Sequence, residues 1–375
     1  VATNGDNTAH TSWTTAFTNI QDALDAAADG DTVHLAGHDF VLADELVWSA
    51  SGVAILGGYA ATNAADAPGP FDARRWPTVI RAGGEPASVS NRVLRIAQVT
   101  NGLLARVTLT GGLAPPVTVD ATALYGGGLL IENCAGIVLS DCLVTNNAMR
   151  KGTLKQSAYG GGIAAVDSAV NVSNCVVREN SAIGNWGGGG YTGGGGVALV
   201  RGAMTLADSV IAHNAVLAGT SFLLSGGVYT SAGTLAMRNC LVYGNSGQTV
   251  VTTTHGGALY LNGDARLEHC TVAHNTLTGI RRAGGTVTVE NSILWGNLED
   301  IVGTVAVRWS NIGDGTNEGI DGCIRADPLF DRGYYLSPGS PCADAGTNTA
   351  AYWGLDGYTT RADGTGDSGR VDMGY

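Results

Sequence analysis

Three features of this sequence indicate an all-β chain wound as a right-handed parallel β-helix with three short sheets. A seven-residue pattern recurs, apolar residues alternate with a period of two, and glycine clusters separate the copies. Alternation with a period of two is typical of strands, whereas helices repeat every ~3.6 residues. Repeats about 30 residues long are typical of stacked coils, each of which buries the face of its neighbour. We therefore expect one continuous solenoid.

The recurring pattern begins with a polar residue followed by Cys or Ser, and it ends with Asn. The final Asn recurs after 33, 34, 31, 30 and 22 residues. These residues are Asn147, Asn180, Asn214, Asn245, Asn275 and Asn297. Stacked amides can hydrogen-bond to one another along the axis of a solenoid, so the pattern predicts an Asn ladder.

The second position of the pattern predicts a further ladder of small buried side chains. Cys142, Cys175, Cys240 and Cys270 occupy it, and Ser209 and Ser292 fill it in the other copies. Free Cys behaves as a compact hydrophobic residue. No zinc site is expected, because the thiols lack the Cys and His spacing of such sites.

Each copy is expected to contain three strands. A glycine cluster such as Gly126–Gly128 opens a short apolar strand, an alternating strand follows, and the Cys/Ser strand is third. Insertions follow the Asn in the longer copies. They span 148–159, 181–192, 215–225 and 246–255. Loops stacked on one side of a solenoid are expected to build a wall and a groove.

The two ends differ from the repeats. Residues 1–60 are expected to form an N-terminal cap and first coil, 61–310 the β-helix coils, and 311–375 an irregular closing segment rich in Asp, Gly and Thr. Residues 17–28 predict an amphipathic helix, with Ile20 and Leu24 on one face. Such a helix would shield strand edges that could otherwise pair with another chain.

Composition narrows the classes of partner. The chain has 375 residues, 14% of them charged, and a formal charge of −12, which argues against nucleic acid or an anionic membrane as a partner. No apolar run is long enough to span a membrane. The chain begins at Val1, which suggests a processed mature form whose signal peptide has been removed.

Cys323 and Cys342 lie outside the ladder and make the expected disulfide, if the compartment is oxidising. Cys134 would stay unpaired or join Cys142. No metal site and no cofactor are expected, with calcium as the one candidate. Asp363–Asp367 offers oxygen ligands at alternate positions, but the EF-hand spacing is missing and a plain turn is favoured.

Alternation places two columns on the outside of the Cys/Ser strands. The first is apolar: Leu143, Val176, Val210, Leu241, Thr271 and Ile293. A column of apolar side chains facing water is costly. We expect the chain's own loops to cover it, and the alternative is an association surface for a partner or a second copy.

The second column and the loops beside it supply the candidate ligand-binding residues. These are Arg178, Glu179, His213, Tyr243, His274, Trp295, Trp186 and Tyr191. Rings can stack on sugar faces, and cationic side chains can meet carboxylates or sulfates. The predicted ligand is therefore a polysaccharide or cell-surface glycan that carries negative charge.

Several motifs resemble known families. Residues 18–33, which begin Thr-Asn-Ile-Gln-Asp-Ala-Leu and end Gly-Asp-Thr-Val, resemble the opening of pectin-lyase-like right-handed β-helices. Residues 56–59 and 75–79, with the Gly and Asn repeats, resemble bacterial secreted parallel β-helix repeat proteins and, more loosely, polymorphic outer-membrane adhesins. Residues 327–346 and 370–374 resemble the C-terminal region called choice-of-anchor Q. The resemblance implies an extracellular or cell-surface protein, but no reaction.

The sequence contains no recognisable catalytic motif. The short motifs of polygalacturonases, pectate lyases and pectin methylesterases are absent from the sequence. A polysaccharide lyase acting on uronic-acid chains would use Lys151, Lys155 or His213 as the base, and Arg178 or calcium to stabilise the enolate. A hydrolase would need two carboxylates about 5–9 Å apart, and the residues expected beside the second column supply only Glu179. Each His and Lys is more simply explained as a solvated surface group.

We therefore expect a structural, adhesive or glycan-binding β-solenoid. A polysaccharide lyase and a self-assembling fibre or surface-layer subunit are the alternatives.

Overall fold

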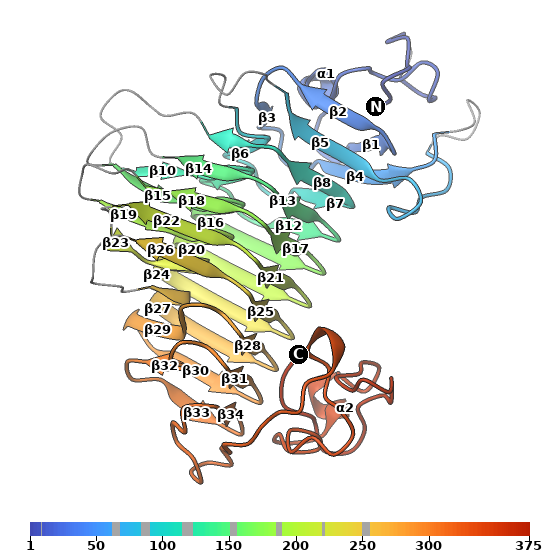
Figure 1. The fold of residues 1–375 in the computed structure, drawn as a ribbon. Coiled ribbons are helices and arrows are strands. Elements are labelled where there is room, and N and C mark those ends of the chain that lie inside the picture. The colour runs from blue at the N-terminus through green and yellow to red at the C-terminus, as the bar shows by residue number, and fades with distance from the viewer. Residues whose placement is uncertain are drawn as a thin grey trace.

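The computed structural model describes residues 1–8, 10–61, 68–83, 91–114, 123–150, 156–184, 190–219, 222–249 and 256–375. The described chain is a parallel β-solenoid whose strands stack rung upon rung (Figure 1). The prediction of an all-β chain of stacked parallel strands is confirmed.

Within the described residues the strands form four sheets, of fifteen, ten, five and four strands. The ten-stranded sheet contains the six Cys/Ser strands, which are β13 (Leu143–Thr145), β17 (Val176–Arg178), β21 (Val210–Ala212), β25 (Leu241–Tyr243), β28 (Thr271–Ala273) and β31 (Ile293–Trp295). It also contains β2 (Asp39–Leu42), β5 (Thr78–Ala82), β8 (Val107–Thr110) and β34 (Asn311–Ile312). The fifteen-stranded sheet contains β1 (Thr32–Ala36), β3 (Leu46–Trp48), β4 (Ala54–Tyr59), β6 (Leu94–Ala97), β7 (Leu103–Ala105), β11 (Leu129–Glu132), β12 (Ile137–Ser140), β16 (Ile163–Ser173), β20 (Val197–Ala207), β24 (Ser225–Arg238), β27 (Gly257–Glu268), β29 (Thr278–Gly284), β30 (Val287–Glu290), β32 (Ile301–Val302) and β33 (Ala306–Arg308).

The first two strands expected in each coil run together in the middle of the solenoid. β11 and β12 both pair with the single long strand β16, and β20, β24 and β27 continue it. In β16 the bend between the two halves has one residue with positive φ, Asp167 (49°), and in β20 it has two, Arg201 (63°) and Gly202 (96°). The chain therefore bends without leaving the sheet.

The inserted segments form strands where loops were expected. The five-stranded sheet contains β9 (Leu113–Ala114), β14 (Ala148–Arg150), β18 (Ser181–Ile183), β22 (Ala215–Gly219) and β26 (Ser246–Thr249), and the four-stranded sheet contains β10 (Ala123–Tyr125), β15 (Ser157–Tyr159), β19 (Tyr191–Gly193) and β23 (Phe222–Leu223). Backbone groups of one insertion are satisfied by the next, as in any parallel ladder. Apolar side chains from the two sheets, including Leu124 and Met149, share a small core.

The Asn ladder stands at the bend that follows the ten-stranded sheet. Each side-chain amide from Asn147 to Asn275 donates to the Oδ1 of the next Asn, with N–O distances of 2.9–3.0 Å, and the last acceptor is Asn297. Each Oδ1 also accepts from the backbone N–H of the preceding Asn. The ladder closes the coils with satisfied polar groups where strand pairing stops.

Glycines and the ladder are sterically linked. A Cβ on Gly162 would lie 2.9 Å from Asn180 Nδ2, and one on Gly196 would lie 2.8 Å from Asn214 Nδ2. One residue earlier, a Cβ on Gly195 would lie 2.3 Å from Ala215 O and 2.5 Å from Gly226 O. The glycine clusters are therefore required by close contacts with the ladder and with neighbouring backbone.

The expected N-terminal helix is present as α1 (Ile20–Ala26). Asn19 caps it by accepting from Gln21 N–H at 2.8 Å, and Ile20 and Leu24 point into the core. The Gln21 side chain bonds both the N–H and the C=O of Val47 in β3. The helix thus satisfies the backbone of a strand that would otherwise have a free edge.

The C-terminal segment lies along the flank of the solenoid, beside β28 and β31 (Figure 1). It contains the 3₁₀ turn η1 (Arg332–Tyr334) and the short helix α2 (Ala350–Trp353). Leu336, Cys342 and Met373 pack against Ile293 of β31. Tyr375 N–H donates to Thr271 Oγ1 at 3.0 Å.

The packing of the C-terminal segment determines how much of the apolar column is exposed to solvent. Parallel register aligns its six members in one file. Leu241, Thr271 and Ile293 are buried, whereas Leu143 and Val176 stay half-exposed. The chain does cover the lower part of the column, but with the C-terminal segment rather than with the inserted loops.

The predicted disulfide between Cys323 and Cys342 is wrong. Both thiols are free and buried. Cys323 belongs to the main core, whereas Cys342 packs in the separate cluster around Ile293 and accepts a hydrogen bond from Asn311 Nδ2 at 3.1 Å. Burial raises the pKa of the Cys342 thiol to about 11, so it stays protonated and unreactive.

The Cys/Ser slot is a hydrogen-bonded ladder as well as a packed one. Cys175 N–H donates to Ser209 Oγ, and Cys270 N–H donates to Ser292 Oγ, both at 3.1 Å. Cys142, Cys175, Cys240 and Cys270 are all buried free thiols. None of the helices in the described part of the chain is long and apolar enough to cross a membrane.

Candidate functional site

Strand register places the candidate side chains in a second column on the ten-stranded sheet. From β17 to β31 this file contains Arg178, Ala212, Tyr243, Ala273 and Trp295. The two alanines are buried, Arg178 is exposed and Tyr243 is half-buried. Large side chains alternate with alanine, so they stand about 10 Å apart, two rungs of the sheet.

Each coil leaves this sheet through one residue with positive φ. These are Glu179, His213, Gly244, His274 and Gly296, with φ between 50° and 68°. A Cβ on Gly244 would lie 2.6 Å from His213 Nδ1, and one on Gly296 would lie 2.7 Å from His274 Cδ2. Each imidazole therefore lies against the glycine of the next coil, which holds the ring at the surface.

Four rings from two distant parts of the chain form a continuous group that we call the aromatic row: His213, Tyr243, Tyr334 and His274. Tyr243 contacts His213 edge-on at 4.9 Å between ring centroids and Tyr334 at 4.8 Å. Tyr334 lies 5.6 Å from His274, and its hydroxyl is 3.2 Å from His274 Nδ1. The Phe330 ring contacts the Tyr334 ring edge-on, with 5.3 Å between the two ring centroids. These separations are typical of favourable ring contacts.

Tyr334 is not among the ligand-binding residues that the sequence predicted. Its place in the row follows from where residues 311–375 fold, and the sequence carries no signal of that beyond the aromatic character of the residue.

Arg178 lies one strand beyond His213 and is paired with its neighbour. Its Nη1 is 3.9 Å from Glu179 Oε1, and Thr145 Oγ1 donates to Glu179 Oε2 at 3.2 Å. Both charged side chains are about half exposed, at 47% and 45%. Exposed ion pairs contribute at most about 1 kcal/mol. The guanidinium therefore remains able to exchange Glu179 for an anionic ligand.

Other candidates are not brought to the row. Trp295 is half-buried and packs against the cluster around Ile293. Tyr191 is 48% exposed and contacts Phe222, but it lies on β19, far across the solenoid from β25 (Figure 1). The wall expected beside the second column is therefore absent at Tyr191, because the inserted strands extend away from the ten-stranded sheet. Lys151, Lys155 and Trp186 lie outside the described residues.

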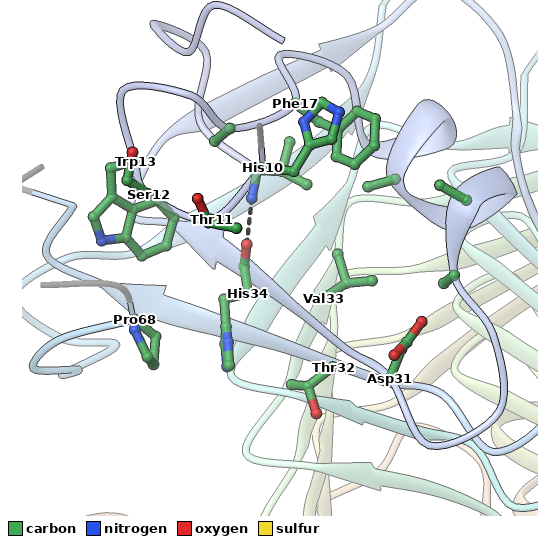
Figure 2. Close-up of a pocket in the computed structure, with 15 residues that line it drawn as sticks. His10, Thr11, Ser12, Trp13, Phe17, Asp31, Thr32, Val33, His34 and Pro68 are labelled. Atoms are coloured by element: carbon green, nitrogen blue, oxygen red, sulfur yellow. Dashed lines mark hydrogen bonds between the residues drawn. The ribbon is translucent and has the colours of Figure 1, made fainter. Parts of the chain in front are cut away.

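A cavity of about 350 Å³ lies between the N-terminal segment, α1 and β1 (Figure 2). The His10 ring stacks on Phe17 with centroids 3.6 Å apart, and Trp13 and His34 line the other side. Burial lowers the pKa of His34 to about 4, so this imidazole is neutral at pH 7. The cavity combines apolar and ring surface, and among the described residues no nucleophilic side chain hydrogen-bonds to His10 or His34.

A smaller cavity of about 180 Å³ lies at the other edge of the ten-stranded sheet, where the C-terminal segment meets the solenoid. His269 lines it from the solenoid, and Tyr358, Asp367 and Asp372 line it from the segment. We call it the seam cavity. Sequence reasoning treated Asp367 as part of a surface turn, but this carboxyl is only 3% exposed.

Acidic residues gather beside the seam cavity. Carboxylate oxygens of Asp344, Asp367 and Asp372 lie within 4.8 Å of one another, a spacing that a metal ion can bridge. However, Arg361 bonds both oxygens of Asp372 at 2.8 and 2.9 Å, and Thr360 Oγ1 and Asp344 N–H also donate to them. Asp372 is therefore fully hydrogen-bonded, and Arg361 supplies the positive charge that the cluster needs.

The stability of the C-terminal segment should depend on pH through Asp367. Burial raises the pKa of this carboxyl from 3.8 to about 6. The hydrogen bond from Asp372 N–H and the charge of Arg361 oppose the rise, whereas the negative charges of Asp372 and Asp344 add to it. The contribution of Asp367 to stability is therefore full below pH 3.8 and is lost as pH rises through about 6. Burial also lowers the pKa of His269 from 6.5 to about 4. The contribution of His269 to stability is therefore full above pH 6.5 and is lost as pH falls through about 4.

The Asp367→Asn substitution separates the effect of Asp367 on stability from that of His269, because it removes only the carboxyl group of residue 367. We expect the melting temperature of the variant, relative to that of the parent chain, to rise between pH 4 and pH 7 in thermal melts followed by circular dichroism. The exposed Asp363→Asn change is the control and should track the parent. A difference that stays constant across this range would show that Asp367 does not titrate on unfolding.

No protein-family model matches the chain, and a search of curated proteins finds no match. The geometry of the site therefore carries the functional argument.

Proposed function

We propose that this protein is an extracellular or cell-surface β-solenoid that binds glycan chains along the outer face of its ten-stranded sheet. The supporting observation is the aromatic row: four rings with centroids 4.8–5.6 Å apart that are left partly open to solvent. Three of them lie on or directly after strands of the ten-stranded sheet, and Tyr334 comes from the C-terminal segment. Rigid rings offer stacking area with little loss of side-chain entropy on binding. Arg178, one strand beyond His213, adds a cation for a carboxylate or sulfate on the same chain.

The motifs that resemble pectin-lyase-like and choice-of-anchor Q proteins agree with this proposal, because those families are exported. A glycan-binding role fits the row better than proton transfer does. The imidazole of His213 is packed against Gly244 and Tyr243, and Arg178 is paired with Glu179. Less apolar surface is available for self-assembly than the sequence suggested, because half of the apolar column is buried by the chain itself.

Replacing Tyr243 by alanine should weaken polysaccharide binding about tenfold or more, because the central ring of the row is lost. Affinity electrophoresis with alginate, polygalacturonate, chondroitin sulfate and xylan measures this. Tyr191→Ala is the matched control, since this exposed ring lies on another sheet.

Three results would contradict the proposal: no binding to the panel by the parent chain, an unchanged Tyr243→Ala variant, or an equal loss in Tyr191→Ala. Following the absorbance of unsaturated products in the same mixtures, with and without calcium, tests the lyase alternative. Product formation would replace the binding role with a catalytic one.

A further inference from the structure

Away from the aromatic row, four tyrosines form a continuous group that we call the tyrosine stack: Tyr125, Tyr159, Tyr229 and Tyr260. Neighbouring ring centroids along it lie 5.9, 4.7 and 5.9 Å apart. The first two residues end the strands β10 and β15 of the four-stranded sheet, whereas the last two lie on β24 and β27 of the fifteen-stranded sheet. The stack therefore joins the inserted strands to the long strands of the solenoid.

Small residues in the intervening coil explain why the ring of Tyr159 reaches that of Tyr229. On the four-stranded sheet, Tyr159 is aligned with Gly193. On the fifteen-stranded sheet, Tyr229 is aligned with Ala198. A Cβ on Gly193 would lie 2.7 Å from Leu224 Cβ, so this position has no room for a side chain. Ala198 packs in one buried cluster with both tyrosines, and the two rings meet across its coil.

The central pair of the stack is the closest and the most nearly parallel. The planes of the Tyr159 and Tyr229 rings are inclined by 4°, whereas those of the outer pairs are inclined by 22° and 37°. The two residues are 8% and 6% exposed.

The hydroxyl groups of this pair also meet. Burial raises the pKa of both phenols, and a hydrogen bond between the two hydroxyls raises the pKa of Tyr159 further and opposes the rise at Tyr229. Tyr159 is therefore the donor and Tyr229 the acceptor. Parallel rings whose hydroxyls meet also bring together the ring carbons next to the hydroxyls, which are the ortho carbons.

Ortho carbons are the atoms through which two tyrosines couple after oxidation. A one-electron oxidant takes one electron from each phenol, each hydroxyl releases its proton, and two phenoxyl radicals result. The radicals combine through a new C–C bond between one ortho carbon of each ring. The hydrogen on each of these carbons then moves to the phenol oxygen, which restores both aromatic rings. The product is a dityrosine, with two electrons given to the oxidant and two protons to solvent.

Burial of the central pair does not prevent this reaction. Tyr125 and Tyr260, at the two ends of the stack, are half-buried and so meet solvent. Each end ring contacts a ring of the central pair with centroids 5.9 Å apart, so an electron from the centre can refill an oxidised end ring. Coupling is irreversible, so it collects the radicals at the pair that couples.

We propose that Tyr159 and Tyr229 form an oxidative crosslinking site, which a one-electron oxidant of the kind that a peroxidase generates from hydrogen peroxide converts to an intramolecular dityrosine. The new bond joins β15 to β24. All seven cysteines are free, so the link differs in kind from a disulfide but restricts the unfolded chain in the same way. The crosslinked chain should therefore melt at a higher temperature. Glycan binding is not needed for any of these steps.

Photo-oxidation of the intact chain in dilute solution, with tris(bipyridyl)ruthenium and persulfate as the oxidant, tests this. Mass spectrometry of the digested product should find one crosslinked species that contains Tyr159 and Tyr229 and lacks two hydrogen atoms relative to the separate peptides. Tyr159→Phe and Tyr229→Phe should each abolish it, because phenylalanine has no phenol to oxidise. Both changes keep the buried ring and with it the packing. Tyr352→Phe is the control, since Tyr352 is 70% exposed and lies outside the stack.

The crosslinking site is overturned if no dityrosine forms, if dityrosine only joins separate chains, if the link maps to other tyrosines, or if it survives in either phenylalanine variant. Equal melting temperatures before and after crosslinking would remove its stabilising role. These outcomes are distinct from a failure of glycan binding, which Tyr243→Ala tests on another sheet.

Discussion

Asn214→Ala is expected to lower the free energy of unfolding by about 3–5 kcal/mol, because it leaves several buried polar groups without partners at about 1–3 kcal/mol each. Asn214 Oδ1 accepts from both the backbone and the side-chain amide of Asn180 at 3.0 Å. Its Nδ2 donates to Val177 O at 2.9 Å and to Asn245 Oδ1 at 3.0 Å. All of these contacts are buried, so water cannot replace them without opening the coil.

Urea unfolding followed by circular dichroism measures the loss. Asn146→Gly is the matched control, because Asn146 is exposed, lies outside the ladder and has φ of 54°, which glycine accepts without strain. The control should stay within about 0.5 kcal/mol of the parent chain. If Asn214→Ala cost no more than Asn146→Gly, the ladder would be a consequence of the fold and not a source of its stability.

Gly195→Ala is the second change with a large expected effect, about 3 kcal/mol or more, through overpacking. The new Cβ would lie 2.3 Å from Ala215 O and 2.5 Å from Gly226 O. Both are backbone atoms of stacked strands, which cannot move aside as a side chain can. Relief requires neighbouring coils to separate and strand hydrogen bonds to lengthen.

Gly357→Ala is the control for this change. A Cβ there meets nothing within 4 Å and the residue has no positive φ. Thermal melts of the two variants should therefore diverge strongly, with the control close to the parent chain. Equal melting temperatures would mean that the coils are packed more loosely at Gly195 than these distances indicate.

These two predictions rest on residues that were recognisable before any coordinates. The Asn of each repeat and the glycines that precede each long strand meet in space, as Gly196 meets Asn214. Equivalent positions of successive repeats lie above one another in a solenoid. The Asn ladder and the glycines beside it could therefore both be inferred from their spacing in the sequence. The N-terminal helix was predictable from the sequence as well, because its signals are local.

The inserted segments were misjudged as loops because their strand character is not local. β19 contains only Tyr191, Thr192 and Gly193, too few residues to show alternation. They become strands because the insertions of adjacent coils lie side by side and pair, as Ala158 pairs with Thr192. Pairing of this kind depends on a neighbour, which single-chain periodicity cannot reveal.

The disulfide prediction failed for a related reason. Cys323 and Cys342 are close in the sequence and share the end of the chain, but one closes the main core and the other packs against β31. Sequence distance does not measure spatial distance once the chain turns back along the solenoid.

By itself the sequence determined the solenoid, the place of its ladders and the glycines they require, because these repeat at fixed spacing and depend on local backbone geometry. Only the tertiary structure decided where residues 311–375 lie, and with them the aromatic row and the seam cavity. The physical reason is that both sites join Tyr243 or His269 to partners 66 to 106 residues away in the C-terminal segment, through contacts that no periodicity encodes.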